Sequence, residues 1–155
     1  MKLSHLIDSS LVIKAINDCI DEGLRDGNDL SLAIKGDCMA PLLQNGGSVQ
    51  IAQQSNYLPG DIVAYFCPYK KERLLHRVLG RVAFDSLIKE SEEQRYLIKA
   101  DNGLKPDTLV RNSLILGKAV DLKVAYTKRL SCFVVNYYWQ LKIYFNKFTV
   151  NKESE

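Results

Sequence analysis

The middle of the chain carries short apolar or alternating runs that are separated by glycine, proline, asparagine and charged residues. Runs of this kind predict β-strands joined by tight turns. We expect the strands at residues 32–34, 49–52, 62–66, 74–84, 96–100 and 114–124. The charged segments 70–73 and 89–95 are predicted to be solvated hairpin loops. The fold class is therefore predicted to be mainly β, with one compact β-domain over residues 31–125.

Near the N-terminus the apolar positions repeat with the period of a helix. Ser9 or Ser10 is a candidate N-cap, Gly27 is a stop, and the apolar positions between them are Val12, Ile13, Ile16, Cys19, Ile20 and Leu24. Residues 1–30 are thus predicted to form an amphipathic helical extension that packs on the domain or docks a partner. Lys14, Asn17 and Asp18 interrupt the apolar stretch, so we expect neither a signal peptide nor a membrane span.

The C-terminal segment, residues 126–155, is predicted to be a second amphipathic helix followed by a tail. Its apolar face is aromatic and consists of Leu130, Phe133, Val134, Tyr137, Tyr138, Leu141, Tyr144, Phe145 and Phe148. This face could cover the β-domain, bind a partner or lie peripherally in a membrane interface, and its composition would also suit strands. Asn136, Gln140 and Lys142 argue against a full span.

Composition limits the function classes. A chain of 155 residues favours one domain, and a net charge of +3 is too small to indicate nucleic acid as a partner. The four cysteines, Cys19, Cys38, Cys67 and Cys132, are scattered without a Cys-x-x-Cys pair, so we expect no metal site, no disulfide framework and no cofactor. A reducing, cytoplasmic location follows, with the inner membrane surface as a candidate peripheral site.

Cys38 is the candidate nucleophile. It lies between Gly36 and a Met-Ala-Pro sequence in which Pro41 suits the first turn of a short helix. A helix N-terminus lowers the pKa of a thiol, whereas the neighbouring Asp37 raises it, so a basic partner is needed. The alternative is that Cys38 is simply a small buried apolar residue.

The basic partner has few candidates because the chain has only two histidines. His5 lies close to the terminus. His76 lies in a strand-like run, where a rigid backbone could orient the imidazole. His76 is therefore the predicted general base, and a histidine that only packs in the core or on the surface is the alternative.

Several segments in series resemble one family. Residues 36–46 are similar to its Gly-x-Ser-Met-x-Pro-x-Leu-x-x-Gly nucleophile box, with Cys38 in place of serine and Gly46-Gly47 in place of Gly-Asp. Residues 59–63 resemble its Gly-Asp-Ile-Val strand, residues 76–78 its base-carrying box, residues 99–107 its Lys-Gly-Asp-Asn segment and residues 115–120 its closing strand. The family is that of the signal peptidase I-like serine proteases and their self-cleaving repressor relatives, and the closest branch is the histidine-type branch of the endoplasmic reticulum and archaea.

The resemblance implies a signal-peptidase-like β-domain with a catalytic site. Cys38 would attack the carbonyl carbon after His76 accepts its proton, and a carboxylate would orient the imidazole. The resemblance favours Asp107 for that role and leaves Asp101 as the alternative, and either aspartate could instead be a turn carboxylate. Backbone N–H groups around Gly36, Cys38 and Met39 would form the oxyanion site, since Gly36 stands where some relatives have a serine hydroxyl.

The predicted activity is an endopeptidase that cleaves a peptide or protein precursor after small residues. The main alternative is a catalytically weak or inactive module that binds a precursor or leader for another enzyme. A self-cleaving repressor is disfavoured, because no Ala-Gly or Cys-Gly pair precedes the nucleophile box and the N-terminal segment is too short for a helix-turn-helix domain.

Overall fold

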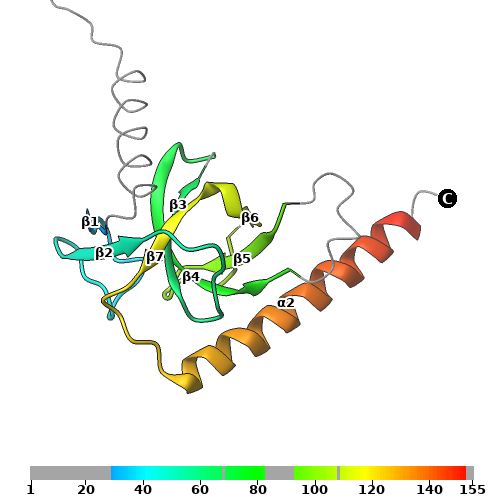
Figure 1. The fold of residues 1–155 in the computed structure, drawn as a ribbon. Helices are drawn as coiled ribbons and strands as arrows, with labels where there is room; N and C mark the ends of the chain where they lie inside the picture. Colours follow the sequence, from blue (N-terminus) through cyan, green and yellow to red (C-terminus); the bar gives the residue numbers. More distant parts are fainter. Residues whose placement is uncertain (1–28, 68, 83–92, 108, 153–155) are drawn as a thin grey trace, which may run out of the picture.

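The computed structural model describes residues 29–67, 69–82, 93–107 and 109–152. These residues form a seven-stranded antiparallel sheet in the order β1-β2-β7-β3-β4-β5-β6, with one long C-terminal helix beside it (Figure 1). The strands are β1 (Leu30–Ala33), β2 (Ser48–Ala52), β3 (Ile62–Cys67), β4 (Glu72–Arg81), β5 (Arg95–Lys99), β6 (Val110–Arg111) and β7 (Ile115–Ala119). A short 3-10 turn, η2 (Asn112–Leu114), precedes β7, and α2 spans Tyr126–Lys152. The mainly β class predicted from the sequence is confirmed.

Five of the six predicted strands lie where the apolar runs place them, as β1 to β5. The last prediction was too long, because β7 ends at Ala119 and the chain then bends at Val120 and Asp121. The Asp121 carboxylate accepts a hydrogen bond from the backbone N–H of Gln50 at 3.4 Å, and this contact holds the bend against β2. The two-residue strand β6 was not predicted, because two residues are too few to show the alternation of apolar and polar positions that indicates a strand.

The charged segment 70–73 is a hairpin turn only in part. Lys70 and Lys71 lie in the turn, with Lys71 at a φ of +54°, whereas Glu72 and Arg73 already pair in β4. The predicted N-terminal helix over residues 1–30 and most of the loop 89–95 lie outside the described residues.

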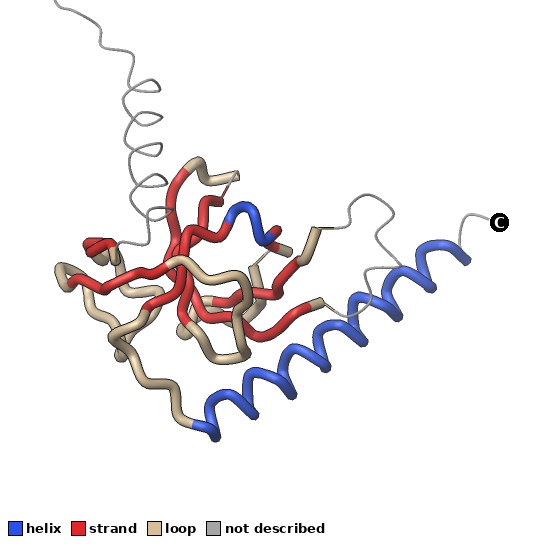
Figure 2. Tube along the Cα trace, viewed as in Figure 1, coloured by secondary structure: helices blue, strands red, loops and turns tan. Residues whose placement is uncertain are grey.

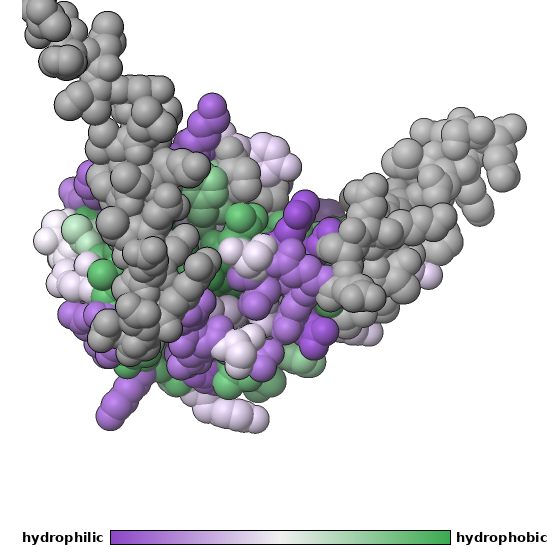
Figure 3. Space-filling view, turned by 45° about the horizontal axis from the view of Figure 1, so that its top comes forward, coloured by the Kyte–Doolittle hydropathy of each residue, from purple (hydrophilic) through white to green (hydrophobic). Residues whose placement is uncertain are grey.

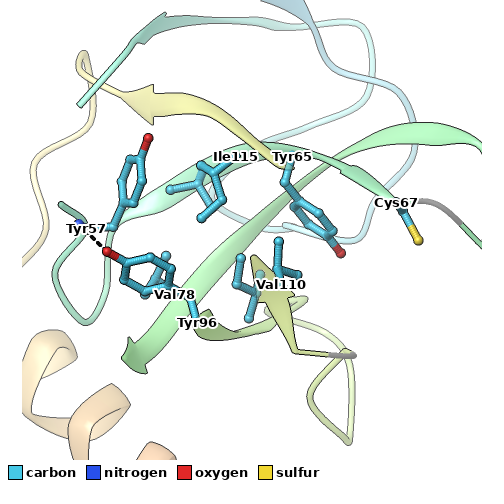
Figure 4. Close-up of a cluster of buried hydrophobic side chains, with 9 residues drawn as sticks. Tyr57, Tyr65, Cys67, Val78, Tyr96, Val110 and Ile115 are labelled. Carbon is cyan, nitrogen blue, oxygen red and sulfur yellow. Dashed lines mark hydrogen bonds between the residues drawn. The ribbon is translucent and has the colours of Figure 1, made fainter. Parts of the chain in front are cut away.

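Strand β3 lies in the centre of the fold and buries side chains on both of its faces. Ile62 and Ala64 pack into one cluster with Met39. Val63 and Tyr65 pack into the other, which Figure 4 shows as a group of tyrosines and branched aliphatic side chains between β3, β4, β5 and β6. Successive side chains alternate across a strand, so β3 and β4 carry two separate sets of buried residues.

Helix α2 runs along one side of the sheet (Figures 1 and 2) and contacts β4. Its buried stripe consists of Cys132, Asn136 and Gln140. The side-chain amides of Asn136 and Gln140 both donate to the Arg81 carbonyl, at 3.2 and 3.0 Å. The helix is confirmed and the strand alternative is excluded. The helix packs on the domain through a stripe other than its predicted aromatic face.

The first turns of α2 are tied to the start of β3. Arg129 donates to the Pro59 carbonyl at 2.9 Å and forms an ion pair with Asp61 at 3.0 Å. Asp61 is buried and also pairs with Lys118 of β7 at 3.3 Å. A buried carboxylate between two cations therefore joins α2 to two strands.

Hydrophilic and hydrophobic residues are interspersed on the face of the molecule shown in Figure 3. Within the described ranges, no helix combines the length and the apolar character that crossing a membrane requires.

Candidate active site

Cys38 lies in the loop between β1 and β2, and its neighbours fix this loop. Met39 is 1% exposed and Leu43 is also buried, whereas Cys38 is only partly buried. The Leu43 amide donates to the Met39 carbonyl at 3.1 Å. Gly36 turns the chain with a φ of +81°, a conformation that favours glycine. The backbone is thus held by the core while the thiol stays accessible.

The prediction of a short helix after Cys38 was wrong. The chain makes separate turns instead, closed by single hydrogen bonds such as that from the Ala40 amide to the Asp37 carbonyl at 3.0 Å, and the Ala40–Pro41 peptide is cis. No run of consecutive i to i−4 bonds forms across this proline, so no helix N-terminus faces the thiol. The backbone N–H groups of Cys38 and Met39 face the sulfur in its place and lower the pKa of the thiol.

The pKa of Cys38 is nevertheless raised overall. Burial is the largest cause, and the negative charge of Asp107 adds to it. The two backbone N–H groups and the charge of Lys70 oppose this shift only in part. The resting group at neutral pH is therefore a thiol, and a base must remove its proton before it can attack.

His76 and Asp107 form an imidazole–carboxylate pair. The Nδ1 of His76 lies 2.5 Å from Oδ2 of Asp107, and the Tyr65 hydroxyl donates to the same oxygen at 3.0 Å. The amide of Asp107 donates to the Ile98 carbonyl at 2.8 Å, which fixes the loop against β5. His76 itself is 4% exposed and lies in the middle of β4.

The contacts of Asp107 determine the direction in which its pKa is shifted. Burial alone would raise the pKa of Asp107, but the hydrogen bonds and charge of His76 and the hydroxyl of Tyr65 hold it below its ordinary value. An ionised Asp107 accepts a hydrogen bond from Nδ1–H of His76, so Nε2 is the ring nitrogen that the carboxylate does not engage. Among the described residues Nε2 has no hydrogen-bond partner. Nε2 is therefore the ring nitrogen of His76 that is available to a neighbouring group.

Asp101 has a different partner. Its two carboxylate oxygens accept from Nε and an Nη of Arg77, at 2.7 and 2.6 Å, and Arg77 also donates to the Gly60 carbonyl at 2.7 Å. Burial of Asp101 is outweighed by these contacts, so its pKa is also below the ordinary value. Of the two aspartates left open by the sequence, Asp107 is the one that contacts His76.

The sulfur of Cys38 lies beside the backbone of β4, one residue before His76. Its thiol donates a weak hydrogen bond to the Leu75 carbonyl, at 3.8 Å. The charge of Asp107 raises the pKa of Cys38, and a thiolate at Cys38 would be the smallest of the causes that raise the pKa of Tyr65. Cys38 is thus close enough to Asp107 and Tyr65 for their charges to interact, but its hydrogen bond is to the backbone and not to the imidazole, and it packs with Leu75 in the cluster that contains Met39. Catalytic hydrogen bonds are often loose in the absence of substrate.

The predicted oxyanion residues differ in their availability. The amide of Gly36 already donates to Oδ1 of Asn45 at 3.1 Å, which engages it elsewhere. The amides of Cys38 and Met39 form no hydrogen bond to another described residue and lie beside the sulfur. These two N–H groups are the ones that can face an oxyanion.

An apolar cleft adjoins the thiol. It has a volume of about 240 Å³, and its lining comes from the segment at and after β1 (Leu32 to Lys35), from Cys38 and Met39, and from Arg73 to Leu75 of β4, with Val49 and Ala64 beneath. β1 pairs only with β2, and β5 pairs with β4 only from Arg77 onward. The cleft therefore lies between two strand edges and contains Cys38.

Two residues of the site were not assigned a role from the sequence. Tyr65 supports Asp107, and it could have been found from strand pairing, because Val63 pairs with His76 and Tyr65 is on the same face two residues later. Asn102 holds the Cys38 turn: its side chain donates to the Asp37 carbonyl at 2.8 Å and its amide to the Cys38 carbonyl at 3.3 Å. No sequence period indicates a contact between segments so far apart.

No known protein family has a model that matches this chain, and no curated protein matches it significantly. Within the described ranges, no three His, Cys, Asp or Glu side chains gather as a metal site would require. Cys38, Cys67 and Cys132 are free thiols, while Cys19 lies outside the described residues.

Proposed function

We propose that the chain is a thiol-dependent endopeptidase with a signal-peptidase-like β-domain, acting on a peptide or protein precursor. The observation that carries the proposal is that the Cys38 thiol contacts the β4 backbone at Leu75, one residue before the His76 that pairs with Asp107, at an apolar cleft between two strand edges. A buried histidine with one nitrogen on a carboxylate and the other available is the arrangement of a general base. No metal or cofactor is part of the proposed chemistry.

Acylation uses the thiol of Cys38, the imidazole of His76, the carboxylate of Asp107 and two backbone amides. Nε2 of His76 takes the proton of the Cys38 thiol as the sulfur attacks the carbonyl carbon of the scissile peptide. Asp107 stabilises the imidazolium that forms, and the amides of Cys38 and Met39 donate to the oxyanion. The C–N bond then breaks, and the leaving amine takes the proton from His76. The products of this half-reaction are a thioester at Cys38 and a free amino terminus.

Deacylation repeats these roles with water. His76 removes a proton from the water as its oxygen attacks the thioester carbonyl, and the same amides face the second oxyanion. The C–S bond breaks, the sulfur regains a proton, and the carboxyl product leaves. The thiol and the neutral imidazole are restored.

The cleft supports an extended substrate. A peptide lying between β1 and β4 can pair with strand edges through its backbone, as in β-strand addition. The apolar lining and a volume of about 240 Å³ suit one small or medium apolar side chain close to Cys38. We infer that such a residue precedes the cleaved bond.

A binding module without turnover is the second candidate. The Cys38 thiol donates to the Leu75 carbonyl and its pKa is raised, and both features favour a resting thiol over a thiolate. Such a module would use the same cleft to hold a precursor or leader for another enzyme.

The deciding experiment compares small peptides and precursors, by mass spectrometry, in cells that carry the wild-type chain or Cys38→Ala. A precursor that accumulates in the variant is then incubated with purified proteins. We expect the wild type and Cys67→Ala to cleave it, and Cys38→Ala and His76→Ala to bind it without cleavage. Cleavage by Cys38→Ala would remove the catalytic assignment, and binding without cleavage by the wild type would establish the second candidate.

A further inference from the structure

Helix α2 has two unlike faces. Cys132, Asn136 and Gln140 lie towards the sheet and are buried. The opposite face, here called the outer face of α2, carries large apolar side chains that are each more than half exposed: Leu130, Phe133, Val134, Tyr137 and Tyr138. Residues three and four apart lie on one side of a helix, so these five form a continuous apolar strip. Phe145 extends it by two turns and is 62% exposed.

All charged residues of α2 are cations. Over Tyr126–Lys152 the sequence contains no aspartate or glutamate, and its cations are Lys128, Arg129, Lys142, Lys147 and Lys152. Lys128 and Arg129 are engaged by Asp101 and Asp61 of the domain. Lys142 places its ammonium 4.8 Å from the centre of the Trp139 ring, at the margin of the outer face.

The charge and composition of α2 favour an anionic lipid surface over a second copy of the chain as the partner of the outer face. Pairing the outer face with that of a second copy would bring two helices together that each carry cations and no carboxylate, which disfavours the contact. An anionic lipid surface complements the lysines of α2 that follow Arg129, and tyrosine, tryptophan and phenylalanine are favoured at the depth of the headgroups. Since α2 does not qualify as a span, it would lie in the plane of the surface.

We propose that the outer face of α2 docks the protein on an anionic lipid membrane. The helix lies flat at the interface. Leu130, Phe133 and Tyr137 insert into the lipid, and the sheet lies on the side of the helix that faces water. This docking rests on α2 alone and is independent of the peptidase chemistry proposed above.

The docked orientation places the cleft in water. Helix α2 contacts Gly80 and Arg81 at one end of β4, whereas the cleft lies at Leu75. Five residues of extended strand span about 17 Å. Because the outer face points away from the sheet and the cleft belongs to the sheet, a membrane-bound protein would present Cys38 to water.

The test measures co-sedimentation of the full chain with vesicles of phosphatidylcholine alone or with about one third phosphatidylglycerol. We expect binding to the anionic vesicles, a loss of at least tenfold in affinity for the double variant Phe133→Gln/Tyr137→Gln, and a loss of about fivefold for Lys142→Gln. Leu104→Gln is the matched control, because Leu104 is 94% exposed but lies on the β-domain, and it should bind as the wild type does.

Two results would overturn the docking. One is that the wild type and the double variant bind anionic vesicles equally or not at all. The other is that the wild type is a dimer by light scattering and the double variant is a monomer, which would identify a second copy as the occupant. Cys38→Ala should bind vesicles normally, so loss of the peptidase proposal would leave this result unchanged.

Discussion

His76 and Arg77 are consecutive residues of β4, yet they hold different aspartates on opposite faces of the strand. His76 contacts Asp107 and Arg77 contacts Asp101. Both β4 side chains are 4% exposed, so each needs its partner. The two carboxylates therefore have separable roles, and their asparagine variants form a matched pair.

Asp107→Asn should reduce the proposed peptidase activity strongly. An asparagine can no longer accept the Nδ1 proton as an anion, so His76 loses both the correct tautomer and the charge that stabilises its imidazolium. We expect kcat to fall by about 10³ to 10⁴-fold while the protein stays folded. The measurement is single-turnover cleavage of the identified precursor with circular dichroism as a check of the fold. Activity within a few-fold of the wild type would exclude Asp107 as the orienting group.

Asp101→Asn should instead reduce stability. It leaves the buried guanidinium of Arg77 without its anion, which costs roughly 3 kcal/mol. Because the folded pKa of Asp101 is below its ordinary value of 3.8, the stability it contributes is present above that pH and is lost as pH falls through the folded pKa. Urea unfolding at several pH values should therefore show the largest difference from wild type at neutral pH. A difference independent of pH would contradict this account.

Tyr65→Phe tests the support of Asp107. Removing the hydroxyl takes one donor from the carboxylate, raises the pKa of Asp107 towards its ordinary value and lowers stability at neutral pH by roughly 2 kcal/mol. Since the wild-type pKa is depressed, this loss should disappear under strongly acid conditions. The acid limb of the activity profile should also move to higher pH.

The control for Tyr65 is Tyr57→Phe. Tyr57 is a buried phenol of the same hydrophobic cluster and contacts Tyr96 in place of Asp107. Its substitution can change stability, but it should leave the acid limb where it is. An equal displacement of the acid limb in both variants would indicate a general packing effect.

The titration of the Cys38 thiol should respond to two nearby charges in opposite directions. Asp107 raises the pKa of Cys38 and Lys70 lowers it. Alkylation by iodoacetamide should thus begin at lower pH in Asp107→Asn, even though that variant loses catalysis, and should be slower by about twofold in Lys70→Gln. Peptide-resolved mass spectrometry measures both rates, and Lys71→Gln is the control for Lys70. Shifts in the same direction would show that these charges do not act on the thiol.

Gly80 determines how closely α2 approaches β4. A Cβ at this position would lie 2.4 Å from Nδ2 and 2.9 Å from Cγ of Asn136. We expect Gly80→Ala to destabilise the protein by roughly 1 to 3 kcal/mol. Asn136→Ala in the same chain should recover part of this loss, because it removes the clashing atoms. A double-mutant cycle in urea measures the coupling, and strict additivity would place the cause elsewhere.

Strand positions were predictable where packing repeats along the chain. The buried runs of β3 and β4 and the alternation of β2 carry enough apolar residues to indicate a strand without knowledge of its neighbours. The two-residue β6 and the bend at Asp121 were not predictable, since they depend on a partner strand far away in the sequence. Cys38, His76 and Asp107 could be proposed from their residue types and the resemblance.

The amphipathic pattern of α2 predicted a helix correctly but not the side that packs. The apolar residues of such a pattern usually face the core, whereas here Asn136 and Gln140 face it and bond the Arg81 carbonyl. Cys132, Val135 and Trp139 pack on the sheet beside these two amides, so the packed side combines polar contacts with apolar residues outside the predicted aromatic face.

The sequence by itself determined the mainly β class and the final helix and indicated the candidate site residues, because these follow from local periodicity and from residue chemistry. The tertiary structure decided which aspartate meets His76, that Tyr65 supports it, that the amides of the turn face the sulfur in place of a helix end, and which side of α2 stays exposed. Apart from the turn amides, which belong to Cys38 and Met39 themselves, each of these depends on atoms that are distant in sequence and come together only when the strands pair and α2 packs on them.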